Sequence, residues 1–314
     1  PSPAPYVHLH LHSEYSLLDG ANRIDKLIAR VQELAMDAVA VTDHGNLHGA
    51  VEFYTKAKDA GVKPILGVEA YVAPGDRTDR TYTGIQDGGF HLVLLAENQT
   101  GWANLLKLCS DAYLNGFYFK PRMDKSTLTR WSEGLIAING HLGSSLAHHL
   151  SQYVQTKKDE HWRRAIEEAR WHARTFGANE DGEPRFYVEL QRHINEQEAI
   201  NPLLVKLARE LDLPLVCDND SHFLLAEDHD AHDSLICIST GKVKDDAARM
   251  RYSTDLYVKS PDEMAALFRG YEGGAGDEAM ANTRRIAGRC NVELDFEANH
   301  APVVKVEYSG AGSF

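Results

Sequence analysis

Seven short apolar runs recur along the chain, separated by longer segments in which apolar residues return every three or four positions. The runs are rich in Val, Ile and Leu and alternate only partly, which is typical of strands buried on both faces of a parallel sheet. We therefore predict seven strands, over residues 6–11, 38–42, 64–72, 91–97, 134–139, 185–190 and 214–218.

The segments between these runs have helical periodicity. After the first run, apolar side chains follow the spacing of an amphipathic helix at Ile24, Leu27, Ile28, Val31 and Leu34. Similar patterns predict helices over 98–113, 159–176 and 196–211. Strands that alternate with helices favour an α/β fold with a parallel sheet, open or closed into a barrel.

The pattern changes after about residue 240. Residues 254–259 are predicted as a further strand. SPDEMAALF (260–268) is predicted as a helix with a capping box of Ser260 and Glu263, and EGGAGDE (272–278) as a flexible turn or linker. We expect a barrel domain over 1–240 and a small C-terminal extension over 241–314.

Composition and charge argue against a membrane-spanning protein and against a stand-alone nucleic-acid binder. The 314 residues are 43% hydrophobic and 25% charged, and no apolar run approaches the roughly 20 residues of a membrane span. Four scattered cysteines without a CxxC pair suit a reducing cytoplasm. A net charge of −13 argues against a stand-alone nucleic-acid binder, although bound divalent cations would reverse the local field.

Ionisable residues lie near the predicted strands, mostly at their carboxyl ends. Active sites of α/β sheets and barrels are found at this end of the strands. The segments are HLHLHSEYSLLDG (8–20), TDHGN (42–46), Glu69, His91, NGH (139–141), Glu189 with Arg192 and His193, and DNDSH (218–222). On a regular strand His8, His10 and His12 would point together. His91 departs from the pattern because it begins its apolar run, so it enters from a loop or its register differs.

A single such cluster would fit a structural hydrogen-bonding role, or a polar edge strand. Seven strands that each offer His, Asp or Glu need cations among them, because isolated buried charges are costly. His and carboxylate ligands without Cys favour Zn²⁺, then Mn²⁺ or Fe. The candidates exceed what one ion can use, so we expect two or three ions, a type of cluster that hydrolyses phosphate esters.

The motifs resemble, in order, those of the polymerase and histidinol phosphatase (PHP) domain family. They are HLHLHSEYSLLDG, VTDHGNLHGAVEFY, PILGVEAYV, FHLVLLAEN and CDNDSHF. The flanks, including NLLKLCSDAYLNGFYFKPRMDK and NDSHFLLAEDHDAHDSLICISTGK, are similar to the branch of this family at the N-terminus of bacterial DNA polymerase III alpha subunits. The resemblance covers residues 6–300.

The resemblance implies a distorted seven-stranded (β/α) barrel with three divalent metal ions. One ion would be held by His10, His12, Glu69 and Asp220; Glu69 would bridge to a second, held by His91 and His141; the third would be held by Asp19, His44 and His222. Position 141 is often Cys in the family, but His also coordinates zinc. His8 and Asp43 would support the ligands, Asp43 by orienting His44.

The same resemblance implies metal-dependent phosphodiester hydrolysis, expected here as 3′→5′ exonuclease proofreading with a metal-bridging hydroxide as nucleophile. The partners would be a DNA 3′ primer end, the remainder of the polymerase alpha subunit and the replisome. Polymerisation is not expected, because the palm carboxylates would lie beyond Phe314. A structural metal-binding domain and a small-molecule phosphatase of the histidinol phosphatase type are the alternatives.

The loop GFYFKPR (116–122) mixes aromatic and basic residues. Lys120 and Arg122 could contact substrate phosphates, and the aromatics at 117–119 could stack on an unpaired base or pack the loop onto the barrel. Arg192 and His193 are further candidates at the barrel mouth.

Overall fold

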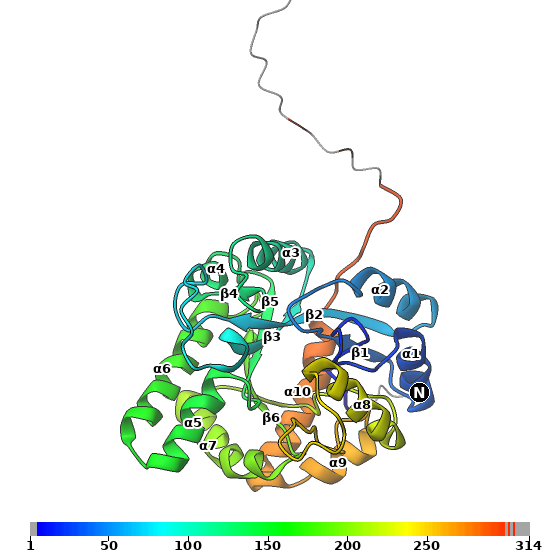
Figure 1. Cartoon of the computed structure of the whole chain (residues 1–314). Helices are drawn as coiled ribbons and strands as arrows, with labels where there is room; N and C mark the ends of the chain where they lie inside the picture. The colour runs from blue at the N-terminus through cyan, green and yellow to red at the C-terminus, as the bar shows by residue number, and fades with distance from the viewer. Residues whose placement is uncertain (1–4, 299–300, 302–303, 305–314) are drawn as a thin grey trace, which may run out of the picture.

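A curled, mixed sheet surrounded by helices forms the body of the protein in the computed structural model, which describes residues 5–298, 301 and 304 (Figure 1). The sheet order is β1-β2-β3-β5-β6-β7, and β4 pairs with β2. The strands are β1 (Ala38–Val41), β2 (Lys63–Val72), β3 (Phe90–Ala96), β4 (Arg122–Met123), β5 (Leu135–Asn139), β6 (Phe186–Leu190) and β7 (Leu215–Cys217). The expected α/β class and barrel-like sheet are confirmed.

Ten α-helices and three short 3₁₀ helices are seen in the described residues. The α-helices are α1 (Ile24–Glu33), α2 (Ala50–Asp59), α3 (Gln99–Leu114), α4 (Lys125–Arg130), α5 (Ser145–Thr156), α6 (Asp159–Phe176), α7 (Asn195–Leu211), α8 (His229–Thr240), α9 (Pro261–Phe268) and α10 (Ala275–Arg289). The 3₁₀ helices are η1 (Gln86–Gly88), η2 (Ala226–Asp228) and η3 (Tyr271–Gly274). Within the described part of the chain, each helix is too short or too polar to span a membrane.

The expectation of a parallel sheet is wrong for one strand. β3 runs antiparallel to both β2 and β5, and its register pairs His91 with Tyr71. The amino end of β3 therefore lies at the same edge of the sheet as the carboxyl ends of its neighbours. This direction explains why His91 begins its apolar run and still reaches the edge where the other ionisable residues lie.

Residues 6–11, predicted as the first strand, form no regular strand but close the barrel between β1 and the segment after β7. On one side the Ala40 amide donates to the His8 carbonyl at 2.8 Å. On the other side the His12 amide donates to the Ser221 carbonyl at 2.9 Å. The segment thus joins the two edges of the sheet by a few hydrogen bonds.

The alternation of side chains breaks within this segment. Leu9 packs in the apolar cluster inside the barrel, whereas Leu11 packs in the cluster between sheet and helices. A regular strand would place both on one face. The prediction that His8 points together with His10 and His12 is therefore wrong. His8 instead bonds through Nε2 to the Lys259 carbonyl at 2.8 Å, and it acts as a buried core residue.

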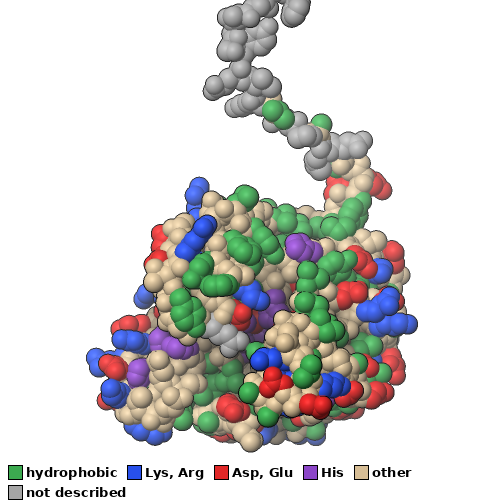
Figure 2. Space-filling model, in the orientation of Figure 1, with side chains coloured by type: hydrophobic (Ala, Val, Ile, Leu, Met, Phe, Trp, Pro, Cys, Tyr) green, Lys and Arg blue, Asp and Glu red, His purple; other side chains and the backbone are tan. Residues whose placement is uncertain are grey.

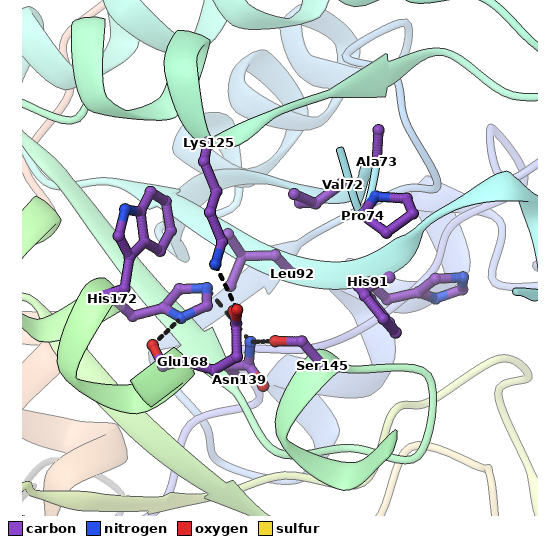
Figure 3. A pocket seen from close by; sticks show the side chains of 12 residues that line it. Val72, Ala73, Pro74, His91, Leu92, Lys125, Asn139, Ser145, Glu168 and His172 are labelled. Atoms are coloured by element: carbon purple, nitrogen blue, oxygen red, sulfur yellow. Dashed lines mark hydrogen bonds and ion pairs between the residues drawn. The ribbon is translucent and has the colours of Figure 1, made fainter. Parts of the chain in front are cut away.

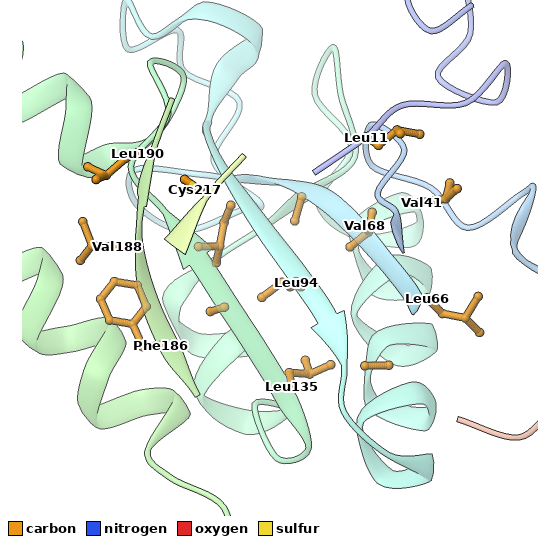
Figure 4. Packing of buried hydrophobic residues seen from close by; sticks show 14 of the residues in the cluster. Leu11, Val41, Leu66, Val68, Leu94, Leu135, Phe186, Val188, Leu190 and Cys217 are labelled. Atoms are coloured by element: carbon orange, nitrogen blue, oxygen red, sulfur yellow. The ribbon is translucent and has the colours of Figure 1, made fainter. Parts of the chain in front are cut away.

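Two apolar cores hold the fold together. The outer core lies between the sheet and the helices, and Figure 4 shows part of it. The inner core fills the barrel and includes Ile286 and Ala287 from α10 and Cys290 directly after it. Helix α10 also bonds to Leu215, the first residue of β7, so it covers the amino end of the barrel. The division at residue 240 stays a prediction. Residues 305–314 of the predicted extension lie outside the described residues.

The predictions for the C-terminal region had mixed outcomes. Helix α9 begins with the expected capping box, in which the Ser260 hydroxyl accepts from the Glu263 amide at 3.2 Å. Residues 254–259 form an isolated bridge, between Tyr257 and Phe223, instead of a strand. The predicted linker over 272–278 is wrong, because these residues belong to η3 and to the first turn of α10.

Candidate metal centre

Nine side chains that sequence analysis predicted as metal ligands lie together at the carboxyl edge of the sheet. Figure 2 shows histidine side chains in a hollow near the centre of this face. Three come from the segment before α1, one follows β1, one each comes from β2 and β3, one follows β5 and two follow β7: His10, His12, Asp19, His44, Glu69, His91, His141, Asp220 and His222.

Glu69 is at the centre of this group and is buried. Five imidazoles surround its carboxylate at N–O distances of 2.7–3.5 Å: His44, His91, His141, His12 and His10. Burial alone would raise the pKa of Glu69, but the positive charge that these rings can carry holds that pKa well below its usual value.

Two further carboxylates complete the centre. Asp220 Oδ1 lies 3.3 Å from His10 Nε2 and 3.1 Å from His12 Nε2. Asp19 Oδ2 lies 2.8 Å from His44 Nε2. The three carboxylates are therefore interleaved with the imidazoles, and each can share a cation with them.

Sequence analysis did not name Glu189 as a site residue, although it noted this residue at the end of β6. Its carboxylate is buried and lies 3.0 Å from His10 Nδ1 and 3.3 Å from His141 Nδ1. Burial would raise the pKa of Glu189, yet the two histidines lower it to about 2. Glu189 therefore stays ionised. It accepts a hydrogen bond from His10 Nδ1, whereas its contact with His141 is an ion pair without hydrogen-bond geometry.

Ser16, which sequence analysis missed and no local pattern marks, links two of the histidines. Its hydroxyl donates to Asp43 at 2.9 Å, so it must accept from His12 Nδ1 at 2.9 Å and from the His44 amide at 3.0 Å. Asp43 thus reaches His44 through Ser16 and the backbone, whereas the prediction had it orient the imidazole. That the group supports ligand geometry remains a prediction.

These fixed partners decide which ring nitrogens carry hydrogen. Carboxylate, carbonyl and hydroxyl oxygens accept from Nδ1 of His10, His12 and His222, the last through the Asp220 carbonyl at 2.7 Å. In the neutral rings Nε2 must then carry a lone pair. Burial, His44 and His222 lower the pKa of His12, which keeps that ring neutral.

In the neutral rings each of these lone pairs faces oxygens that can only accept. Burial opposes a charge on His10 and His222, but Asp220 and the other carboxylates around them raise the pKa of both rings, so without a cation these two rings take up a proton. Within the described residues, the buried atoms without a hydrogen-bond partner include His10 Nε2, His12 Nε2, His222 Nε2, Glu69 Oε2 and Asp220 Oδ1. Lone pairs directed at carboxylates repel one another unless a cation lies between them. The donor set therefore fits divalent metal ions, and triplets of ligand atoms within 4.8 Å of one another are present in the centre.

The residues predicted to contact substrate phosphates differ in their exposure and in their distance from the centre. Arg122 is wrong as a substrate contact: it is 2% exposed, and its guanidinium donates to four backbone carbonyls that fold the loop around it. Lys120 is partly exposed, and its Nζ lies 3.7 Å from Asp87 Oδ1. Asp87 also lies 3.8 Å from His91 Nε2, so Lys120 stands at the edge of the centre.

The remaining candidates are held by other partners. Arg192 pairs with Glu198 at 2.7 Å and stacks on Tyr271 at 4.0 Å, so it does not support the predicted phosphate contact. His193 bonds to Gln191 at 3.1 Å, and burial lowers its pKa to about 4, so it carries no positive charge at neutral pH.

The aromatic residues of the 116–122 loop divide between the two alternatives. Tyr118 packs against the Arg122 guanidinium at 5.0 Å, which matches the packing role. Phe117 and Phe119 are 48% and 69% exposed, so their rings are free to stack on a ligand.

A pocket of about 350 Å³ adjoins the centre near His91 (Figure 3). Phe90, Leu92 and Trp171 supply apolar lining. Its polar groups already pair with one another: Lys125 with Glu168, and Asn139 with Ser145 and His172. We therefore assign no function to this pocket.

Comparisons with known proteins identify the family of this chain. The family model described as the PHP domain matches residues 8–193, a range that ends before Asp220 and His222. The chain is 40% identical over 314 residues to DNA polymerase III subunit alpha of Borreliella burgdorferi, covering 98% of this chain and 26% of that protein. It is 43% identical over 302 residues to the Thermus aquaticus subunit, covering 93% and 23%.

The chain thus spans about a quarter of the length of these curated relatives. Among solved structures, a two-domain protein of Bacteroides vulgatus, described as containing a predicted PHP-like metal-dependent phosphoesterase, aligns with a TM-score of 0.40 at 13% identity. The alignment covers 96% of this chain and 75% of that one.

Proposed function

Because this chain belongs to the PHP domain family, we propose that its centre binds divalent metal ions and hydrolyses phosphodiester bonds at a DNA 3′ end. The observation that carries the proposal is the set of buried imidazole nitrogens that face the Glu69, Asp19 and Asp220 carboxylates, among which Nε2 of His10, His12 and His222 has no hydrogen-bond partner in the described residues. Such an arrangement is costly without bound cations.

The proposed ligands are the nine side chains that the family resemblance implies; they would hold three ions, and Glu69 would serve two of them. Zinc suits the donor set best, with manganese or iron as the next choices. When bound, such ions supply Lewis acidity and lower the pKa of water enough to give a nucleophile at neutral pH.

The chain itself prepares the ligands for this task. Glu189 holds His10 from behind through a hydrogen bond, and Ser16 holds His12, so the Nε2 atoms of these two rings are aimed before an ion arrives. Outer partners of this kind strengthen metal binding in known sites. At the rim, Lys120 offers a positive charge to a phosphate, and Phe119 offers a ring to an unpaired base.

The relatives suggest the setting of this activity. They are replicative polymerase subunits, so we propose that the barrel removes mispaired 3′ nucleotides beside a polymerase, in the cytoplasm. The net charge of −13 gives the chain little attraction for DNA. The remainder of an alpha subunit and the replisome would then supply the grip on the duplex.

The test combines metal analysis with a nuclease assay on matched and mismatched 3′ ends. Wild-type protein should carry about three ions per chain and release 3′ nucleotides, and Glu69→Gln should lose both properties. Glu180→Gln, at an exposed position, is the matched control. Bound metal without hydrolysis would support the structural alternative, and faster cleavage of a small phosphomonoester would support the phosphatase alternative.

A further inference from the structure

Two aromatic side chains from beyond the matched range 8–193 pack against one side of the candidate metal centre. His232, in α8, is buried, and its Nε2 lies 2.7 Å from the Asp19 carbonyl oxygen. The Tyr252 ring is stacked on His232, with 5.4 Å between ring centroids and 17° between planes, and lies 5.1 Å from the His222 ring. Both therefore contact the group formed by Asp19, His44 and His222.

The contact between His232 and Asp19 has a defined direction. A carbonyl oxygen only accepts, so His232 Nε2 must carry the hydrogen. On its other side, the Asp19 amide donates to the Ser16 carbonyl at 2.9 Å. The short turn that presents the Asp19 carboxylate is thus held at both ends.

Tyr252 is itself anchored on both sides along the chain. Before it, the Arg249 guanidinium donates to Asp233 in α8 at 2.6 Å and to the Lys244 carbonyl at 3.1 Å. After it, the Ser253 hydroxyl donates to the His193 carbonyl at 2.8 Å. The ring therefore has little freedom to leave the pair formed by His232 and His222.

We propose that His232 and Tyr252 are positioning residues that hold Asp19 and His222 in place for one metal ion of the centre. Neither side chain needs to touch the ion. His232 fixes the backbone that carries the Asp19 carboxylate, and the stacked pair limits rotation of the His222 ring. This inference rests on the proposed metal centre, and it assigns part of that centre to α8 and the segment after it.

The test measures metal binding by the full 314-residue chain, separately from nuclease activity. The number of zinc ions bound per chain at a fixed concentration of free zinc is measured by elemental analysis. The affinity for zinc is measured by competition with a chelator. His232→Ala and Tyr252→Leu should each weaken one ion about 10- to 100-fold and leave the others unchanged. His232→Gln, whose amide can still donate to the carbonyl, should restore most of the affinity.

Two nearby substitutions serve as matched controls. His229→Ala removes a histidine one turn earlier in α8, and Tyr257→Phe removes a hydroxyl that donates to Glu263 at 2.7 Å. Both should bind zinc as the wild type does. Cobalt-substituted protein adds a spectroscopic readout, because a displaced Asp19 or His222 should change the visible absorption of the affected ion.

The possible outcomes separate this inference from the proposed function. If the wild type binds zinc and the His232 and Tyr252 variants bind it equally well, the positioning role is overturned. It is also overturned if the variants melt earlier in chelator but keep wild-type zinc affinity. If the wild type binds no ion, the proposed metal centre itself fails. Selective loss of one ion without any nuclease activity would keep this inference and refute the exonuclease.

Discussion

Substitution of Glu189 by Gln should weaken metal binding without removing any ligand. The buried carboxylate faces Nδ1 of both His10 and His141, at 3.0 and 3.3 Å. A glutamine of the same size can accept from only one of these nitrogens, because its other end is an NH₂ donor. The second ring then faces an NH₂ donor, which favours the form of the ring with its hydrogen on Nε2 and removes the lone pair that an ion needs.

The magnitude follows from the loss of one correctly oriented ligand. Changes to such outer partners typically cost about 10- to 100-fold in metal affinity, or about 1.4–2.7 kcal/mol. Chelator competition with zinc measures this loss directly. Glu167→Gln, at an exposed position in α6, is the matched control and should leave affinity unchanged.

A pH series gives the same argument a second readout. Since the pKa of Glu189 is lowered to about 2, its contribution to the stability of metal-free protein is present above its unfolded value of about 4.5 and is lost as pH falls toward 2. The difference in unfolding free energy between wild type and Glu189→Gln should shrink over this window. Wild-type zinc affinity in Glu189→Gln would refute the lone-pair reasoning.

Four further substitutions test other parts of the molecule. Lys120→Ala should raise KM for DNA more than it lowers kcat. Arg122→Ala should lower the melting temperature, because it leaves buried carbonyls without donors. The reverse pattern for the two variants would contradict the roles assigned to these residues of the loop. Burial lowers the pKa of His172 to about 4. The wild type should therefore lose stability relative to His172→Gln as pH falls from about 6.5 to 4, by at most roughly 3 kcal/mol in urea unfolding. Parallel pH profiles of the two proteins would contradict this prediction. Ile286→Ala should cost about 2–4 kcal/mol, because α10 fills the inner core, and a neutral effect would show that α10 is dispensable.

The sequence by itself determined the class of fold and the set of candidate ligands. Helical periodicity located α1, α3, α6 and α7 to within one residue at most ends, because burying one face of a helix imposes that period. The resemblance of short motifs to the PHP domain family implied nine candidate ligands, and the structure brings their side chains together. Both results depend on signals that lie within a few neighbouring residues.

Only the tertiary structure decided which side chains face the centre and what holds them. The direction of β3 depends on its partners β2 and β5, and this direction brings His91 to the site. The alternation of side chains breaks where the first segment closes the barrel, and this break separates His8 from His10. The sequence predicts Arg122 as a phosphate contact, but the folded loop surrounds its side chain and buries it.

The supporting residues could not be predicted for the same reason. Glu189 lies 179 positions from His10, and His232 lies 213 positions from Asp19. A hydrogen bond between such distant residues leaves no periodicity or spacing in the sequence, because it is created only when the chain folds and dehydrates both groups together. The identity of a ligand is a local property of the chain, whereas its orientation and its charge depend on the packing of the whole barrel.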